Sequence, residues 1–201
     1  MKMKKWYAGI AALLVAGTCH AQVAFGVKGG PTFSGVIVKQ GQKAQQSKML
    51  MGGTAGIYAR LPLAPVLYVQ PSLLYEMKGG ESKTDNTKTR LGYLTLPIDI
   101  LLKPYSDMNG WFAGAGPYVG YGISGKTKGG EADTKNIFKD SNGLKRWDAG
   151  IHAQAGYEFA SGFNIGLQAG LGLLNLQKNG DSRHAFRTVS YGLTAGYTFG
   201  Q

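Results

Sequence analysis

The sequence has little of three features on which many protein classes depend. Cys19 is the only cysteine in 201 residues, which excludes a disulfide scaffold and a metal site built from several thiolates. Charged residues make up only 16% of the chain, which argues against a coiled coil or a charge-driven disordered chain. After residue 21, no apolar run approaches the roughly 18 residues of a membrane-spanning helix. We therefore expect one folded domain with no metal, no cofactor and no spanning helix.

The first 21 residues follow the pattern of a secretory signal peptide. Three lysines among the first five residues precede an apolar stretch at 6–17, whose 12 residues are too few to span a bilayer as a helix. Small side chains precede a cleavage point after Ala21. The alternative is a lipoprotein acylated on Cys19, although the residues before this cysteine fit that pattern poorly. We therefore predict a signal peptide at 1–21 and a single exported domain at 22–201.

The rest of the chain alternates apolar residues with small or polar ones, which is the period of a β-strand. In the segment 163–174, for example, apolar residues at odd positions alternate with Asn, Gly and Gln. Eight such segments, joined by connections that alternate between long and short, predict an all-β, eight-stranded antiparallel up-and-down transmembrane β-barrel with both termini on one side. The predicted strands are 23–29, 53–61, 67–78, 91–103, 111–124, 146–159, 163–174 and 187–199. The long connections are 35–50, 79–90, 125–145 and 177–186, and the short ones are 62–65, 105–110 and 160–162.

Aromatic residues lie on the apolar face near both ends of these segments. Trp111 and Tyr121 are ten residues apart, about 33 Å along a strand, or roughly 25 Å when the strand is tilted by about 40°. This is the spacing of the two aromatic girdles of an outer-membrane barrel. A soluble, lipocalin-like binder is an alternative, and it requires the apolar face to point inward. The predicted girdle residues are Trp111, Tyr121, Tyr157, Phe159, Phe163, Tyr191, Tyr197 and Phe199.

The opposite face of the predicted strands carries glycine and charge. An eight-stranded barrel is only wide enough inside for side chains to fill it. Buried charges must be paired or hydrogen-bonded, because isolated ones cost several kcal/mol. We therefore predict a packed polar plug with balanced charges rather than an open pore. The predicted interior network consists of Lys28, Arg60, Glu76, Lys78, Asp99, Arg146, Asp148 and Glu158, with Arg60, Asp99 and Glu158 toward the short turns.

Several short motifs occur in order along the predicted strands: Gly26–Gly30, Tyr68–Tyr75, Tyr93–Ile98, Ala115–Tyr121 and Gly196–Phe199. As an ordered set, they resemble the PorT-like outer-membrane barrel family of Bacteroidota-type bacteria. The resemblance covers the chain from the first predicted strand to the last, and it implies an eight-stranded outer-membrane barrel without implying a reaction. The family pattern often has an acidic residue where Thr95 stands, so no role of that charge is carried over. The secretion role of the founding member is not transferred by a shared barrel.

Two further features raise the question of catalysis or nucleotide binding. The segment Gly120–Thr127 matches the phosphate-loop pattern, but poor helix formers follow it and an antiparallel strand precedes it. His152 faces inward beside Asp148 and Gln154, and no nucleophile accompanies it at the loop end. We interpret the first as a chance match and the second as a hydrogen-bonded interior histidine. We therefore expect the protein not to be an enzyme, with a barrel hydrolase as an alternative.

The long connections are rich in lysine, which bears on possible partners. The formal net charge is +11. The lysines of the third long connection are Lys126, Lys128, Lys135, Lys139 and Lys145. We interpret them as a solvated loop. The alternative is contact with the phosphates of lipopolysaccharide or with a surface or periplasmic protein.

We expect the chain to be a monomeric protein of the cell outer membrane, with the lipid bilayer as its surroundings and no nucleic acid as a partner. Its role is expected to be structural or in surface interaction, without catalysis. A narrow transport or secretion-accessory barrel is the second hypothesis, because the same alternation of strands could enclose a conduit. The sequence names no ligand and no physiological process.

Overall fold

A computed structural model gives the conformation of most of the chain. It describes residues 23–40, 43–81, 88–104, 109–128, 134–135, 138, 144–176 and 184–199. The predicted signal peptide at 1–21, with Cys19, lies outside these ranges, and so does Lys139. None of the residues within these ranges belongs to a helix long and apolar enough to cross a membrane.

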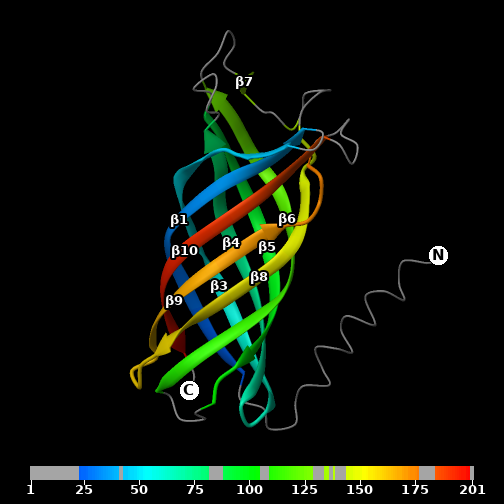
Figure 1. Ribbon diagram of the computed structural model, residues 1–201. Coiled ribbons are helices and arrows are strands. Elements are labelled where there is room, and N and C mark those ends of the chain that lie inside the picture. The colour runs from blue at the N-terminus through cyan, green and yellow to red at the C-terminus, as the bar shows by residue number, and fades with distance from the viewer. Residues whose placement is uncertain are drawn as a thin grey trace, which may run out of the picture.

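Eight strands form a closed antiparallel barrel, coloured from blue to red along the chain in Figure 1. Each barrel strand pairs with the next, and β10 closes the ring against β1, from Phe25 opposite Phe199 to Gln40 opposite His184. Closure leaves no free edge in this ring, and it confirms the predicted eight-stranded up-and-down barrel. The strands are β1 (Ala24–Gln40), β3 (Lys48–Ala64), β4 (Leu67–Glu81), β5 (Lys88–Leu102), β6 (Gly110–Lys128), β8 (Trp147–Glu158), β9 (Phe163–Gly172) and β10 (His184–Phe199).

Two short strands extend the sheet beyond the ring. β2 (Lys43–Gln46) pairs with the last residues of β1, and β7 (Thr134–Lys135) pairs with the last residues of β6. Both strands lie in the long connections, and we call their end of the barrel the loop end (Figure 1). The other end is the short-turn end, where Pro65 and Val66 join β3 to β4 and Gly162, with a φ of 85°, closes the turn between β8 and β9.

The strand register shows how strongly the strands are inclined. Following directly paired residues once around the barrel from Leu61 on β3 leads back to Met51 on the same strand, a shift of ten residues. Such a stagger accompanies strands that tilt by about 35–45° to the barrel axis. The steep tilt brings inward side chains of distant strands to the same depth, and so it positions the interior described below.

Several strands are longer than the sequence predicted. The expected connection 35–50 is wrong in its bounds, because β1 continues to Gln40 and β3 begins at Lys48. β6 likewise runs to Lys128, and β10 starts at His184 within the predicted connection 177–186. Hydrophobic alternation reports a strand only where one face avoids water. The hydrogen-bonded ladder continues into segments such as 35–40, where apolar residues follow one another directly and the strict alternation disappears.

Side chains alternate between the outside and the inside of the barrel as the pattern predicted. On β5, Leu94, Leu96, Ile98 and Ile100 point outward and are 41–46% exposed, whereas Asp99 between them is fully buried. This orientation excludes the soluble, lipocalin-like alternative, which needs apolar side chains around the axis.

Val189, which belongs to the predicted apolar face, is buried. It lies on β10 near the loop end, close to Gly35 of β1, and is only 7% exposed. The alternation therefore predicts exposure reliably in the middle of the barrel and less well where strands approach the loops.

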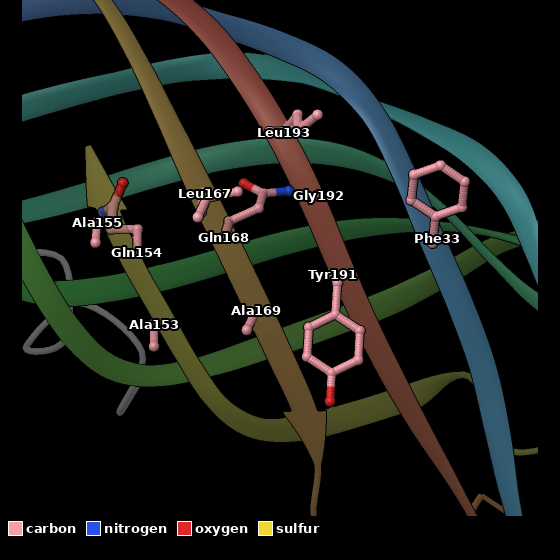
Figure 2. A pocket seen from close by; sticks show the side chains of 10 residues that line it. All are labelled: Phe33, Ala153, Gln154, Ala155, Leu167, Gln168, Ala169, Tyr191, Gly192 and Leu193. Carbon is pink, nitrogen blue, oxygen red and sulfur yellow. The ribbon is translucent and has the colours of Figure 1, made fainter. Parts of the chain in front are cut away.

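The apolar exterior contains a shallow hollow of about 480 Å³ across β1, β8, β9 and β10. Figure 2 shows the small side chains of Ala153 and Ala169 next to each other, with the larger Tyr191 beside Ala169. The register places Ala153 opposite Ala169, and Ala169 opposite Tyr191. The hollow therefore results from small side chains that meet at one height beside large ones.

Candidate functional site

The interior charges form three separate clusters stacked along the barrel axis. The inward residues of β5 give their order, because they run from the short-turn end to the loop end past each cluster in turn. Lys103, just after the strand, belongs to the first cluster, Asp99 to the second and Thr95 to the third. We call them the short-turn cluster, the central cluster and the loop-side cluster.

The short-turn cluster joins Glu158 to two cations. Arg60 Nη1 lies 2.7 Å from Glu158 Oε2, and Lys103 Nζ lies 2.6 Å from Glu158 Oε1. The Thr198 hydroxyl donates a further hydrogen bond of 3.0 Å to the same carboxylate. Arg60 also donates two bonds of 3.2 Å to the amide oxygen of Gln70. All these side chains are buried, so the carboxylate is held by charge and hydrogen bonds together.

The central cluster is built around Asp99. His152 Nδ1 lies 2.8 Å from Asp99 Oδ2, and the Gln154 amide donates a bond of 2.6 Å to the same oxygen. Lys28 Nζ donates to the other end of the Gln154 amide at 3.3 Å. His152 is on β8 and Asp99 is on β5, so the contact crosses β6, where Gly116 pairs with His152. A glycine at this position leaves room for the contact.

The loop-side cluster centres on Lys78. Its ammonium group lies 3.4 Å from Glu76 and 3.3 Å from Asp148, and 4.5 Å from the centre of the Tyr118 ring. The Tyr118 hydroxyl donates to Asp148 at 3.0 Å, and the Thr95 hydroxyl donates to Glu76 at 2.8 Å. Thr95, which stands where the resembling family often has an acid, thus acts here as a hydrogen-bond donor to an acid.

An apolar group covers the interior on the loop side. It consists of Leu91, Tyr93, Phe138, Leu144 and Leu176, each at most 7% exposed, and we call it the apolar cap. Phe138 and Leu144 come from the connection between β6 and β8, and Leu176 follows β9. Sequence reasoning missed the cap because its members lie in predicted loops or on a face that was assigned to polar groups.

The predicted interior residues divide into those that the structure brings together and those that it does not. Arg60 meets Glu158, and Lys78 meets Glu76 and Asp148. Asp99 does not join Arg60 and Glu158, although it was expected at their depth, and it binds His152 and Gln154 instead. Lys28 contacts an amide and forms no ion pair within the described ranges.

Arg146 stands apart from the predicted network. It is half-buried, donates to the Gly122 carbonyl at 3.3 Å, and lies 5.8 and 5.6 Å from the ring centres of Tyr121 and Phe138. Lys103 takes the place that was predicted for a further cation. Its position was available from the sequence, since it continues the inward alternation of Asp99 and Thr95 on β5.

The predicted girdle residues lie on the outside of the barrel. Trp111 is 66% exposed and Tyr191 is 51% exposed, while Tyr157 is half-buried in ring contacts of 5.2 Å with Trp111 and 5.1 Å with Phe159. Tyr121 at the loop end makes a similar contact of 5.1 Å with Trp147, which the sequence prediction left out. The remaining members are exposed as well: Tyr121, Phe159, Phe163, Tyr197 and Phe199.

The phosphate-loop pattern lies entirely on extended backbone. Residues Gly120–Thr127 all belong to β6 and pair with β5. The backbone N–H groups needed to surround a phosphate are therefore engaged in strand pairing or separated along an extended chain. Its structural context does not match that of a nucleotide-binding loop.

Some buried polar atoms at mid-depth have no hydrogen-bond partner within the described part of the protein. They include His152 Nε2 and Asp99 Oδ1 of the central cluster, the Ser72 hydroxyl and the Gln168 amide oxygen. Gln168 lies directly opposite Gln154 of that cluster. Buried polar groups normally pair with protein or with ordered water. We therefore expect hydration around the central cluster, and this is the part of the interior best suited to bind a small polar species.

A family model that describes an outer membrane protein β-barrel domain matches residues 18–178 of the chain. The chain belongs to this family. The barrel is accordingly an outer-membrane protein whose apolar exterior contacts the lipid bilayer. No curated protein sequence matches the chain.

Solved structures of small outer-membrane barrels are similar to this one. Neisserial surface protein A has a TM-score of 0.50 at 10% identity, over 88% of this chain and 99% of that chain. The Yersinia pestis attachment invasion locus protein Ail has a TM-score of 0.49 at 14% identity, over 89% and 99%. OprG from Pseudomonas aeruginosa has a TM-score of 0.49 at 14% identity, over 90% and 98%. At these identities, the likeness concerns the fold alone.

Proposed function

We propose that this chain is a closed, non-catalytic barrel with a structural or surface-interaction role, exposing its loop end outside the cell. The observation that carries the proposal is the filled interior. Three bonded clusters and the apolar cap follow one another along the axis, and the charged side chains of the clusters are buried. Eight-stranded barrels are just wide enough for such filling.

The test is conductance in planar lipid bilayers. We expect no steady open level from the purified barrel at moderate voltages. A variant in which Arg60, Lys78 and Tyr93 are all replaced by Ser serves as the control, because it shortens side chains at three depths and should reveal whether the assay detects an opened lumen. Large, steady conductance from the unaltered protein would overturn the proposal.

A narrow conduit is a second candidate, favoured by the unpartnered polar atoms around His152 and Asp99. Water at this depth would be continuous with solvent only if the short-turn cluster or the apolar cap opened. Stopped-flow shrinkage of proteoliposomes distinguishes the two candidates. Water permeability equal to that of protein-free vesicles supports the closed barrel, and raised permeability supports the conduit.

A hydrolase is the catalytic alternative. The contact between Asp99 and His152 has the arrangement of an acid that orients a histidine, but no nucleophile within the described ranges is hydrogen-bonded to His152 Nε2. His152 is also only 4% exposed. We expect no ester or amide hydrolysis with lipid or peptide substrates, and activity that disappears in His152→Ala would contradict the non-catalytic proposal.

We further propose that the chain is a PorT-like, monomeric member of the family from a Bacteroidota-type bacterium, exported by cleavage after Ala21. The ordered motifs support the first part, and the residues before Ala21 support the second. Mass spectrometry of the protein from outer-membrane fractions tests the cleavage. A mature chain that begins at Gln22 agrees with it, and a chain with acylated Cys19 contradicts it.

A further inference from the structure

A basic pocket lies on the outer surface of the barrel at the loop end, away from the interior clusters. It has a volume of about 460 Å³ and is formed by residues of β4, β5 and β6, among them the buried Leu91 of the apolar cap. Its lining residues are Tyr75, Met77, Lys88, Arg90, Leu91, Gly92, Ser124 and Lys126. Three of these are cations, and none of the lining residues is an acid.

The positions of the cations point to a missing negative charge. Arg90 on β5 lies directly opposite Lys126 on β6, and like charges opposite each other destabilise a strand pair. Glu81 pairs with Lys88 at 3.6 Å, but it also pairs with Lys48 at 3.8 Å. Within the described ranges, no carboxylate pairs with Arg90 or Lys126. An anion bound between these two side chains would relieve their repulsion.

The floor of the pocket lies around Gly92. Gly92 lies at an irregularity in the pairing of β5 with β6, and strand irregularities of this kind are common beside functional sites. A Cβ at Gly92 would lie 2.5 Å from the Ser124 hydroxyl oxygen and 2.8 Å from the Tyr75 hydroxyl oxygen. Two hydroxyl groups thus occupy the place that a side chain at position 92 would need, and both can donate to a phosphate oxygen.

The height of the pocket matches the surface of the bilayer. Tyr121, a predicted girdle residue, precedes Lys126 on β6 by five residues, and Tyr75 forms the lower border. Aromatic girdles lie at the level of lipid headgroups. Below the pocket, Leu73 and Leu94 are outward, 41% exposed, and in contact with lipid tails. The site therefore presents cations at headgroup level directly above an apolar strip.

We propose that this pocket binds a phosphate group of a glycolipid in the outer leaflet, with Arg90 and Lys126 on the phosphate and the acyl chains along the strip below. The inference rests on the proposed orientation, with the loop end outside, and it gives the surface-interaction role a ligand class. It differs from contact by a solvated lysine loop, because it assigns the phosphate to fixed strand positions.

The experiment is a titration of the purified, folded barrel with bis-phosphorylated lipid A, followed by native mass spectrometry from detergent micelles. The double variant Arg90→Gln/Lys126→Gln is expected to lower the affinity at least tenfold. The control Lys145→Gln/Arg187→Gln removes two exposed charges elsewhere on the loop side and is expected to change the affinity less than twofold. Heat-modifiable gel mobility verifies that each variant is folded.

A second variant moves the hydroxyl groups and keeps the charges. The side chain of Gly92→Val should displace the hydroxyl groups of Ser124 and Tyr75 while Arg90 and Lys126 are unchanged, and the variant is expected to lower the affinity for lipid A as well. Phosphate-free lipid A is expected to bind at least tenfold more weakly to the unaltered protein. Repulsion between Arg90 and Lys126 also predicts that Lys126→Gln raises the thermal midpoint of lipid-A-free protein.

Three outcomes would overturn the assignment. Equal losses in the two double variants would indicate attraction by net charge alone. Unchanged affinity in Arg90→Gln/Lys126→Gln would exclude these residues. Full competition by inorganic phosphate at the same concentration as lipid A would indicate a site for soluble anions. Each outcome leaves the conductance and hydrolysis tests of the closed barrel unaffected, so the two proposals fail separately.

Discussion

The short-turn cluster offers the sharpest test of what stabilises the barrel. Glu158 is fully buried, and its carboxylate neutralises two cations, Arg60 at 2.7 Å and Lys103 at 2.6 Å, whose side chains are each 5% exposed. Glu158→Gln keeps the size of the side chain but removes its charge. The buried guanidinium group of Arg60 and the buried ammonium group of Lys103 then share one neutral amide, so the variant should have a lower free energy of unfolding.

The magnitude follows from the burial. Removing one partner of a buried ion pair destabilises proteins by about 3–5 kcal/mol, because the remaining charge is left uncompensated. At about 1.4 kcal/mol for each tenfold change, this lowers the folding equilibrium constant by a factor of roughly 10² to 10⁴. The surface pair of Lys48 with Glu81 provides the matched control, since the Lys48 side chain is 57% exposed. Lys48→Gln should change stability by about 0–1 kcal/mol.

The assay is urea unfolding in lipid vesicles, followed by heat-modifiable gel mobility, with the free energy taken by linear extrapolation. A compensating variant separates lost charge balance from general damage. Glu158→Leu/Arg60→Met/Lys103→Met replaces the whole group by apolar side chains, and such replacements are often neutral or stabilising. It should therefore be more stable than Glu158→Gln. The reasoning is refuted if Glu158→Gln loses no more stability than Lys48→Gln, or if the triple variant is the least stable of the three.

Two further predictions concern the wall of the barrel. Gly116→Ala places a Cβ against a backbone carbonyl of β5 and should lower the free energy of unfolding by about 1–3 kcal/mol. At Gly53 the nearest atom to an added Cβ is 3.7 Å away, so Gly53→Ala should leave the free energy of unfolding unchanged or raise it by about 0.5–1 kcal/mol. Urea unfolding measures both. Leu96→Arg, in the middle of the lipid-facing side, should destabilise the barrel by about 2–4 kcal/mol, and Met49→Arg near the loop end by about 0–1 kcal/mol, measured in vesicles. Equal effects within either pair would contradict the assigned surroundings.

The closed barrel could be predicted from the sequence because the bilayer imposes a strict alternation on every strand that crosses it. Leu94, Leu96 and Ile98 show this, since each is outward and each neighbour is inward. The predicted alternation was weakest at the loop end. There β1 continues to Gln40 through three consecutive apolar residues at 36–38, and Val189 is buried although it belongs to the predicted apolar face. Strand ends beyond the membrane are determined by pairing, which single-strand patterns do not report.

The interior was predictable as a set of residue types but only partly as a set of contacts. Alternation identifies which side chains point inward, and Glu76, Lys78 and Asp148 do meet there. Which inward groups meet depends on the ten-residue shift in strand register around the barrel. It also depends on the small residues that allow contacts across a strand. Asp99 illustrates this. It contacts His152 across β6 and does not join Arg60 and Glu158, which were predicted at the same depth.

Charge balance explains why the predicted number of interior cations is correct although one of the four predicted residues is wrong. Among the residues that the structure describes, four buried acids, Glu76, Asp99, Asp148 and Glu158, require compensation in the narrow interior. Lys28, Arg60 and Lys78 are buried among them, and the fourth buried cation is Lys103 rather than the half-buried Arg146.

Lys103 and Arg146 are therefore expected to contribute differently to the free energy of unfolding. Lys103→Met removes a charged hydrogen bond of 2.6 Å to Glu158 and should cost about 1.5–3 kcal/mol. Arg146→Met loses ring contacts and one bond of 3.3 Å to a carbonyl, and should cost about 0.5–1 kcal/mol. Urea unfolding of the two variants under the same conditions decides between the assignments. A larger loss of stability in Arg146→Met than in Lys103→Met would contradict the assignment of Lys103, and not Arg146, to the interior network.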